Sequence, residues 1–217
     1  MIDVITPHRL EAGTQWLAAH DPDLGRLVLR NGVPPLWRRE PGFATVVLII
    51  LEQQVSLASA QAAFGRLRAA LGEVEPAGFL SLDDAELRAV GFSRQKAEYC
   101  RGLAAGLLDG SVDLEHIATL GDDEARRHLT AVRGIGAWTA DVYLMFALGR
   151  IDTWPPGDRA LLVALGRAKG LVEVPASPIA VEMAEAWRPW RSVAARLLWH
   201  DYLGGRDYLG GRDVVAP

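Results

Sequence analysis

Helix start and stop signals recur at short intervals along the chain, and no segment alternates convincingly between apolar and polar residues with a period of two. Apolar residues return at helical spacing, between glycines, prolines and capping residues that end one segment and begin the next. Helices are predicted over about residues 10–20, 24–30, 43–71, 82–90, 94–108, 122–132, 137–148, after 158, after 177, and 190–203. The sequence therefore predicts an all-α fold.

The segment ATVVLII at residues 44–50 is where helix and strand compete, because its β-branched residues would suit a buried strand. Its continuation to Gly72 contains no proline and keeps helical spacing, so its length favours one long buried helix over residues 43–71, with a break near Ser56 left open. Ser81 and Asp84 fit a capping box for the helix beginning at Leu82. The other predicted N-caps are Ser93, Asp158 and Ser177.

Bulk composition excludes several classes of protein. The chain has 217 residues, and no uncharged apolar run approaches the roughly 20 residues that span a bilayer. Met1–Leu10 lacks an apolar signal core, so we expect a soluble cytoplasmic protein, nucleoid-associated if bacterial. The single cysteine, Cys100, and histidines without HxxxH or CxxC spacing argue against zinc or an iron-sulfur cluster.

Net charge gives no general support for binding a polyanion, because it is −4 and the isoelectric point is about 5.7. All but two of the 23 basic residues are arginine, which suits phosphate contacts but follows equally from a biased Ala/Leu/Arg composition. A nucleic-acid function must therefore be argued from local motifs.

The motif VRGIGAWTA, residues 132–140, places two glycines between two predicted helices. Gly134 and Gly136 can adopt positive φ and bring bare backbone close to a partner. Backbone N–H groups at the start of the helix from Ala137 would then face a phosphate. Taken alone, the two glycines favour a plain turn between two helices, so the motif by itself does not establish a phosphate site.

A longer match decides it. The segment LTAVRGIGAWTADVYLMFALGRIDTWPPGDRALL, residues 129–162, resembles the helix-hairpin-helix base-excision DNA glycosylase superfamily. The segment ILEQQVSLASA, residues 50–60, resembles its alkylation-repair branch, as do DPDLGRLVLRNG near the start and EAWRPWRSVAARLLWHDYL near the end. The similarity covers nearly all of residues 21–203 and indicates the 3-methyladenine DNA glycosylase II (AlkA-type) family.

The resemblance implies a catalytic carboxylate at Asp158, 22 residues after Gly136. Cleavage of an N-glycosidic bond leaves positive charge on the sugar, which a carboxylate stabilises. The alternative role of Asp158 is a helix N-cap, and Asp141 and Asp152 are competing carboxylates. Trp138 stands where strand-cleaving members carry a lysine, so the resemblance implies a monofunctional enzyme that uses water.

Further site residues follow from the same resemblance. Trp138 and Trp199 are assigned to the base pocket, with core packing as the alternative for Trp138. The DNA contacts are assigned to Arg133, Gly134, Ile135, Gly136, Ala137, Gln54 and Arg94. Gln54 has a buried helix-helix hydrogen bond as its alternative, and Arg94 replaces a wedge residue that is often apolar. A monovalent cation is expected on the carbonyls of Thr130, Val132 and Ile135.

The combined prediction is a single glycosylase unit over residues 1–203, built of two helical lobes around a cleft. One lobe comprises residues 43–148, the other residues 1–42 plus 149–203, and residues 204–217 form a flexible tail with a duplicated DYLGGR. It would excise alkylated purines from damaged double-stranded DNA as a monomer without an organic cofactor. The alternatives are a related glycosylase for deaminated or oxidised bases and a non-catalytic helix-hairpin-helix DNA-binding protein.

Overall fold

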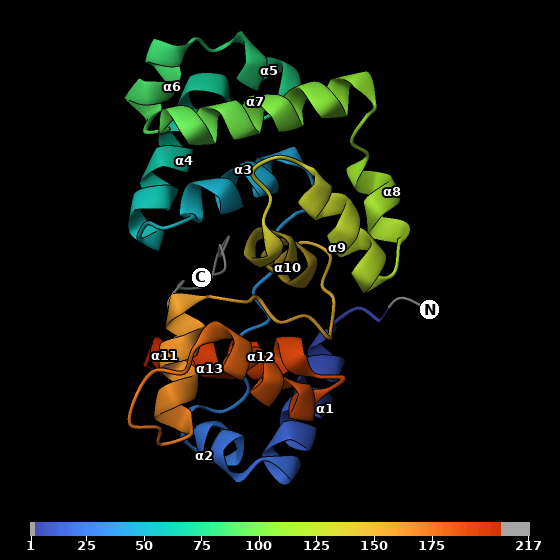
Figure 1. Ribbon diagram of the computed structural model, residues 1–217, viewed down its shortest axis with the longest axis vertical. Coiled ribbons are helices and arrows are strands. Elements are labelled where there is room, and N and C mark those ends of the chain that lie inside the picture. Colours follow the sequence, from blue (N-terminus) through green and yellow to red (C-terminus); the bar gives the residue numbers. More distant parts are fainter. Residues whose placement is uncertain (1–2, 205–217) are drawn as a thin grey trace. The chain divides into compact units, whose positions relative to one another are not determined.

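A computed structural model describes residues 3–204, and these residues form helices joined by short connections (Figure 1). The described residues contain no sheet, and their one strand-like pairing is an isolated antiparallel bridge between Val4 and Arg150. The predicted all-α fold is confirmed. Of the predicted tail, all but Gly204 lies outside the described residues.

The described chain divides into two compact units, residues 40–143 and residues 3–39 with 144–204. The division falls within α10, Ala137–Phe146, between Tyr143 and Leu144. The first unit contains α3 (Phe43–Glu52), α4 (Leu57–Leu71), α5 (Pro76–Ser81), α6 (Asp84–Val90), α7 (Arg94–Asp109), α8 (Leu114–Thr119) and α9 (Asp122–Ala131). The second contains α1 (Pro7–His20), α2 (Pro22–Asn31), α11 (Arg159–Ala168), α12 (Ser177–Ala184), the 3-10 helix η1 (Glu185–Trp187) and α13 (Arg191–Tyr202).

In the unit of residues 40–143, α3 packs against α4 and α7, and α7 also covers α5 and α6 (Figure 1). The aromatic ring of Phe79 lies edge-on to those of Phe43 and Phe92, with ring centroids 5.8 and 5.4 Å apart. α8 contacts α9, whose end leads into the glycine hairpin. The hairpin is therefore a connection between helices of a packed unit.

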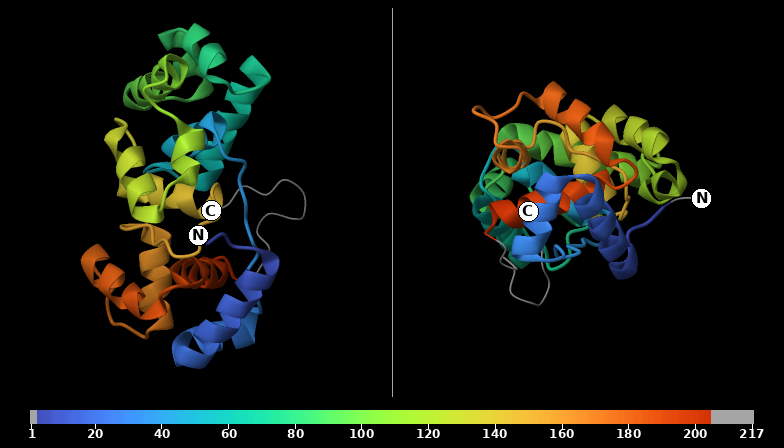
Figure 2. Two further views of the ribbon diagram at one scale, coloured as in Figure 1. Left: turned by 90° about the vertical axis from the view of Figure 1, so that its right-hand side faces the viewer. Right: turned by 90° about the horizontal axis from the view of Figure 1, so that it is seen from below.

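In the other unit, α13 is the central helix, and Figure 2 shows it between α11 and the pair of α1 and α2. Every residue of α13 from Arg191 to His200 is buried. A helix that is covered on all sides needs partners for its polar side chains. α11, which begins directly after Asp158, is thus fixed against the best-buried element of its unit.

Residues 44–50 are helical, as predicted, although their β-branched side chains favour strands. α3 is buried along almost its whole length, so tertiary packing outweighs local propensity. The long helix is interrupted at residues 53–56, and Ser56 caps α4 by accepting the Ser59 N–H at 3.3 Å. The single long helix over residues 43–71 is therefore wrong: two helices replace it, with the break that was left open near Ser56.

The predicted capping box of Ser81 and Asp84 is wrong. The box is formed by Asp83 and Glu86: Asp83 Oδ1 accepts the Glu86 N–H at 2.8 Å, and Glu86 Oε2 accepts the Asp83 N–H at 2.8 Å. Ser81 instead ends α5, a short helix that the sequence did not predict. The competing acidic residues at 83 and 84 place the same motif two residues later than expected.

Other boundaries agree within a few residues, and the remaining differences are small. α8 was not predicted, because six residues carry too little periodicity. Ser177 is the first residue of α12 and Ala176 occupies its cap, so the predicted cap at Ser177 is also wrong. Within residues 3–204, no helix is long and apolar enough to cross a membrane.

Candidate nucleic-acid interface and active site

The hairpin consists of α9, residues 132–136 and the start of α10, and two polar contacts fix its geometry. Arg126 on α9 donates to Asp141 Oδ1 on α10 from Nε at 2.9 Å and from Nη2 at 2.6 Å. Within the turn, the Ile135 N–H donates to the carbonyl of Val132 at 3.0 Å, and the Ile135 side chain is buried. The turn is therefore anchored to its unit at both ends and at its middle.

The two glycines of the hairpin differ in their reason for being glycine. Gly134 has φ of +94°, and a Cβ there would collide with the Tyr99 ring. Gly136 is not among the positive-φ residues of the described chain, is exposed, and has nothing within 4 Å of the place of a Cβ. Of the two glycines that can adopt positive φ, only Gly134 does so. Packing within the unit explains Gly134 but not Gly136.

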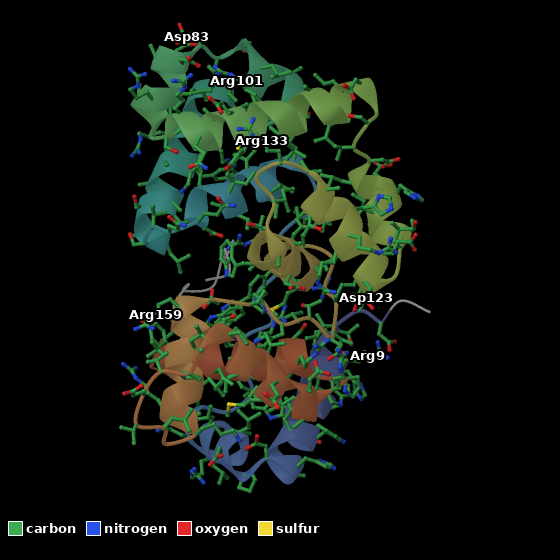
Figure 3. All side chains as sticks on the ribbon, in the orientation of Figure 1. Arg9, Asp83, Arg101, Asp123, Arg133 and Arg159 are labelled. Atoms are coloured by element: carbon green, nitrogen blue, oxygen red, sulfur yellow. The ribbon has the colours of Figure 1, made fainter. Side chains whose placement is uncertain are left out.

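Of the hairpin residues assigned to DNA, three are exposed, whereas Gly134 is half-buried and Ile135 is buried. Gly136 and Ala137 are exposed at the start of α10. Arg133 leaves 81% of its side chain exposed, with its guanidinium 5.8 Å from the Tyr99 ring and 3.8 Å from Glu98 Oε2 (Figure 3). Exposed pairs of this kind contribute little to stability, so Arg133 can exchange its partner at small cost.

Gln54 and its neighbour Gln53 have separate roles. Gln54 is exposed with φ of +59° in the turn between α3 and α4. The buried hydrogen bonding that was the alternative for Gln54 belongs to Gln53, whose Nε2 donates to the Gly134 carbonyl and to Thr139 Oγ1, both at 3.0 Å. The structure thus brings the α3–α4 turn directly against the hairpin.

Arg94, the assigned wedge residue, is the first residue of α7 and leaves 90% of its side chain exposed. Its Nε donates to Glu98 Oε1 at 3.2 Å, one turn along the same helix. Ser93 caps α7 as predicted by accepting the Lys96 N–H at 3.2 Å. An extended arginine at a capped helix start is available to a partner.

Trp138 is half-buried, so its side chain belongs neither wholly to the core nor wholly to the surface.

A monovalent cation was expected on the carbonyls of Thr130, Val132 and Ile135. The Val132 carbonyl already accepts the Ile135 N–H. A carbonyl oxygen has a second lone pair, and oxygen donors suit hard cations. The cation site therefore stays a prediction, and carbonyl oxygens are suitable ligands for such a cation.

Asp158 caps α11, as predicted, and its carboxylate is held from two sides. Asp158 Oδ1 accepts the Leu161 N–H at 2.8 Å and the Trp199 Nε1–H at 3.2 Å. The residue is half-buried, and the preceding Gly157 has φ of +75°, which turns the chain into the helix. The two donors, one from the backbone of α11 and one from the Trp199 indole, hold the carboxylate in a fixed position. The capping role does not exclude the catalytic one, because both need this side chain to be held in a fixed position.

Trp199, assigned to the base pocket, is buried and has an indole that reaches Asp158 from α13. The centroid of its ring lies 5.5 Å from that of Phe146. The guanidinium carbon of Arg196 lies 4.9 Å from the centroid of the Phe146 ring. Arg196 is fully buried and donates to three carbonyls, those of Leu36, Ser192 and Met145. Burial lowers the pKa of Arg196 to about 9, which leaves it charged at neutral pH.

The competing carboxylates are both engaged by arginines. Asp141 is buried and accepts from Arg126, as described above. Asp152 accepts from Arg191 Nε at 2.9 Å and from Arg188 Nη1 at 2.6 Å. Both carboxylates therefore connect segments of the chain through hydrogen bonds with arginines.

The described residues contain no group of three or more His, Cys, Asp or Glu side chains that could hold a metal ion. Cys100 is buried, and burial raises the pKa of its thiol well above its ordinary value. A buried protonated thiol is a poor nucleophile and a poor ligand.

Sequence reasoning missed three residues of this region: Gln53, Lys96 and Arg196. Lys96 Nζ donates to the carbonyls of Leu51 and Gln53, at 2.7 and 2.8 Å, from α7. Each of the three donates to at least one backbone carbonyl that is distant in sequence, and no local spacing reveals such a contact. The sequence motif contains both glutamines, but only the tertiary structure shows that Gln53 bonds the hairpin and that Gln54 is exposed.

Comparison with known proteins gives consistent results. The family described as HhH-GPD superfamily base excision DNA repair protein matches residues 47–191. The Bacillus subtilis protein YfjP is 32% identical over 160 residues, which are 70% of this chain and 56% of YfjP. The chain thus spans little more than half the length of that relative.

Two solved structures are similar over most of both chains. The Schizosaccharomyces pombe 3-methyladenine DNA glycosylase Mag1, in complex with abasic DNA, gives a TM-score of 0.82 at 25% identity and covers 90% of this chain and 98% of its own. The Bacillus halodurans DNA-3-methyladenine glycosidase gives 0.74 at 30% identity, covering 91% and 89%.

Proposed function

The chain belongs to the HhH-GPD superfamily of base excision DNA repair proteins, and from this we propose that it is a monofunctional DNA glycosylase that excises alkylated purines from duplex DNA. The observation that carries the proposal is Asp158, a half-buried carboxylate held by the α11 N-terminus and by Trp199. The 3-methyladenine glycosylases among its structural relatives support the class of lesion.

The proposed chemistry uses Asp158 as an electrostatic stabiliser. The bond between the base nitrogen and the anomeric carbon breaks, and its electron pair leaves with the base. The deoxyribose then carries positive charge, which a fixed carboxylate stabilises more effectively than mobile water. A water molecule adds to the anomeric carbon and loses a proton, which leaves an abasic site.

Alkylated purines such as 3-methyladenine and 7-methylguanine suit this chemistry, because their positive charge makes the base a better leaving group. Aromatic side chains attract such cations by about 0.5–2 kcal/mol. Trp138 and Trp199 are the proposed aromatic residues of the base pocket. Discrimination based on such contacts is modest, so we expect a broad range of alkylated bases.

DNA binding is proposed to use the hairpin and its surroundings: Arg133, Gly134, Ile135, Gly136 and Ala137 at the phosphates, with Gln54 and Arg94 toward the lesion. Phosphate contacts position the protein without reading sequence. A base must leave the stack to be cleaved, and a side chain then fills the gap. We propose that the protein works as a monomer on chromosomal DNA.

Single-turnover base release from duplexes that carry one lesion each tests the proposal. The panel contains 3-methyladenine, 7-methylguanine, hypoxanthine, ethenoadenine and uracil. We expect release of the alkylated purines with an abasic site and no strand cleavage. Release of uracil alone would overturn the lesion class, and duplex binding without any release would identify a non-catalytic DNA-binding protein.

Monofunctionality is tested by borohydride reduction during turnover. An amine nucleophile forms a Schiff base with the sugar, and borohydride converts it into a stable adduct. Because Trp138 has no such amine, we expect no trapped protein–DNA product. Trapped product would show that another amine attacks the sugar.

A further inference from the structure

The turn at residues 53–56 contains a residue in an unfavourable conformation. Gln54 has φ of +59°, a left-handed conformation that glycine, and more rarely asparagine or aspartate, adopts readily. Its side chain is exposed, so burial of that side chain does not compensate. Such conformations persist where the surrounding structure fixes them, and they concentrate at functional sites.

Lys96, on α7, holds the turn at residues 53–56 by hydrogen bonds to its backbone and to the end of α3. Its Nζ donates to the carbonyls of Leu51 and Gln53, which lie at the C-terminal end of α3. A positive charge is favourable there, because the last carbonyls of a helix carry partial negative charge. Lys96 lies in the first turn of α7, two residues after Arg94. One side chain thus links the start of α7 to the turn that contains Gln54.

Gln53 extends this link to the hairpin. Its carbonyl accepts from Lys96, while its side-chain Nε2 donates to the Gly134 carbonyl and to Thr139 Oγ1. Thr139 lies in the first turn of α10. Four hydrogen bonds, all within the unit of residues 40–143, therefore connect three segments that are distant in sequence.

We propose that Lys96 and Gln53 are positioning residues that hold Gln54 and the glycine hairpin in one arrangement for DNA, an inference that rests on the proposed glycosylase function. Both hydrogen bonds of Lys96 go to the turn that contains Gln54 or to the residue just before it. Among the described residues 40–143, Gln54 is the only non-glycine residue with positive φ. Loss of Lys96 frees that turn, so Gln54 no longer meets the lesion in the required place.

The test compares single-turnover base release by Lys96→Met, Gln54→Ala, Gln53→Ala and the two double variants that contain Lys96→Met. We expect Lys96→Met to lose about 10- to 100-fold, the effect of misplacing a group by about 1 Å. When Lys96→Met is added to Gln54→Ala or to Gln53→Ala, the further loss of rate should be only about 3-fold, because the effects of residues that act through one another are not additive. Losses that multiply in both double variants overturn the proposal.

Arg101→Met provides the matched control. Arg101 also lies on α7, donates to the carbonyl of Leu82 at 2.9 Å and pairs with Asp84, but it does not contact residues 53–56 (Figure 3). We expect Arg101→Met to lower stability and keep base release within about 2-fold of the wild type. Lys96→Arg keeps a charged donor and should recover most of the rate. A loss in Arg101→Met equal to that in Lys96→Met overturns the proposal.

A second readout separates this inference from the proposed function. If the wild type releases no base, the glycosylase proposal fails. Affinity for a duplex with a tetrahydrofuran abasic analogue and amide hydrogen exchange at residues 53–56 are then measured. Lys96→Met should bind about 10-fold more weakly and exchange faster than Arg101→Met. Affinity and exchange equal to the wild type overturn the positioning role.

Discussion

Two pairs of arginines, one pair in each unit, have different surroundings. In the unit of residues 40–143, Arg94 and Arg133 leave 90% and 81% of their side chains exposed, and each has a carboxylate partner only at the surface. In the other unit, Arg191 and Arg196 are buried and donate to carboxylates and carbonyls. A buried guanidinium needs such partners, because an unpaired buried charge is costly.

The difference indicates what each unit contributes. Arg133 at the hairpin and Arg94 at the start of α7 are exposed, and under the proposed function they supply local positive charge in a chain whose net charge is −4. Buried arginines hold the backbone around α13, the helix that carries Trp199 to Asp158. The unit of residues 40–143 thus carries the arginines proposed to bind DNA, and the other unit holds Asp158 in place.

Asp158→Asn gives the largest expected effect. Asparagine caps helices as well as aspartate does, so the free energy of unfolding should change little, whereas base release should fall about 10²- to 10³-fold as the charge is lost. Asp158→Ala should lose the rate and also about 1 kcal/mol of stability. Single-turnover kinetics and urea unfolding check both. Base release by Asp158→Asn at the wild-type rate would remove Asp158 from the mechanism.

Trp199→Phe should have the next largest effect, about 10-fold in base release, because it removes the Nε1–H donor that holds Asp158. Trp187→Phe is the matched control, since Trp187 is equally buried and its Nε1–H donates to Asp21 at 2.8 Å. Both variants should lose stability in urea. An equal loss of rate in the two variants would show that the Trp199 hydrogen bond has no special role.

Gly136→Ala should weaken binding to an abasic-analogue duplex about 3- to 10-fold and change stability by about 1 kcal/mol or less, because no group of the protein opposes the added Cβ. Gly134→Ala should instead destabilise the protein strongly, since its φ is positive and Tyr99 fills the space. Fluorescence anisotropy and urea unfolding compare the two. Unchanged affinity in Gly136→Ala would contradict close approach of DNA at this glycine.

Lys169→Met should affect stability and leave base release unchanged. Burial raises the pKa of Asp21, but hydrogen bonds from Lys169, at 2.6 Å, and Trp187 outweigh it, so the pKa is lowered overall from 3.8. The stabilisation is complete above the ordinary pKa and is lost as the pH falls through the lowered one. Urea unfolding from pH 6 to pH 2 should show a flatter pH dependence for the variant. An unchanged pH profile would contradict this pairing.

Much of the fold was predictable because helix positions depend on local sequence patterns, namely periodicity, breakers and capping residues. Helical periodicity and breakers located most of the helices, and Ser93 and Asp158 cap α7 and α11 as expected. The capping box moved from Ser81 to Asp83 because neighbouring acidic residues compete for the same backbone N–H groups. The short α5 and α8 offered too few residues for a periodic signal.

The sequence by itself determined the all-helical class, the hairpin and the family, since each depends on residue types at fixed spacing. The tertiary structure decided which glutamine faces solvent and which bonds the hairpin, and that Gly134 rather than Gly136 has positive φ. It also decided that Trp199 holds Asp158 and that Lys96 holds the α3–α4 turn. These contacts join residues far apart in the chain, and only packing of the helices brings such partners within hydrogen-bonding distance.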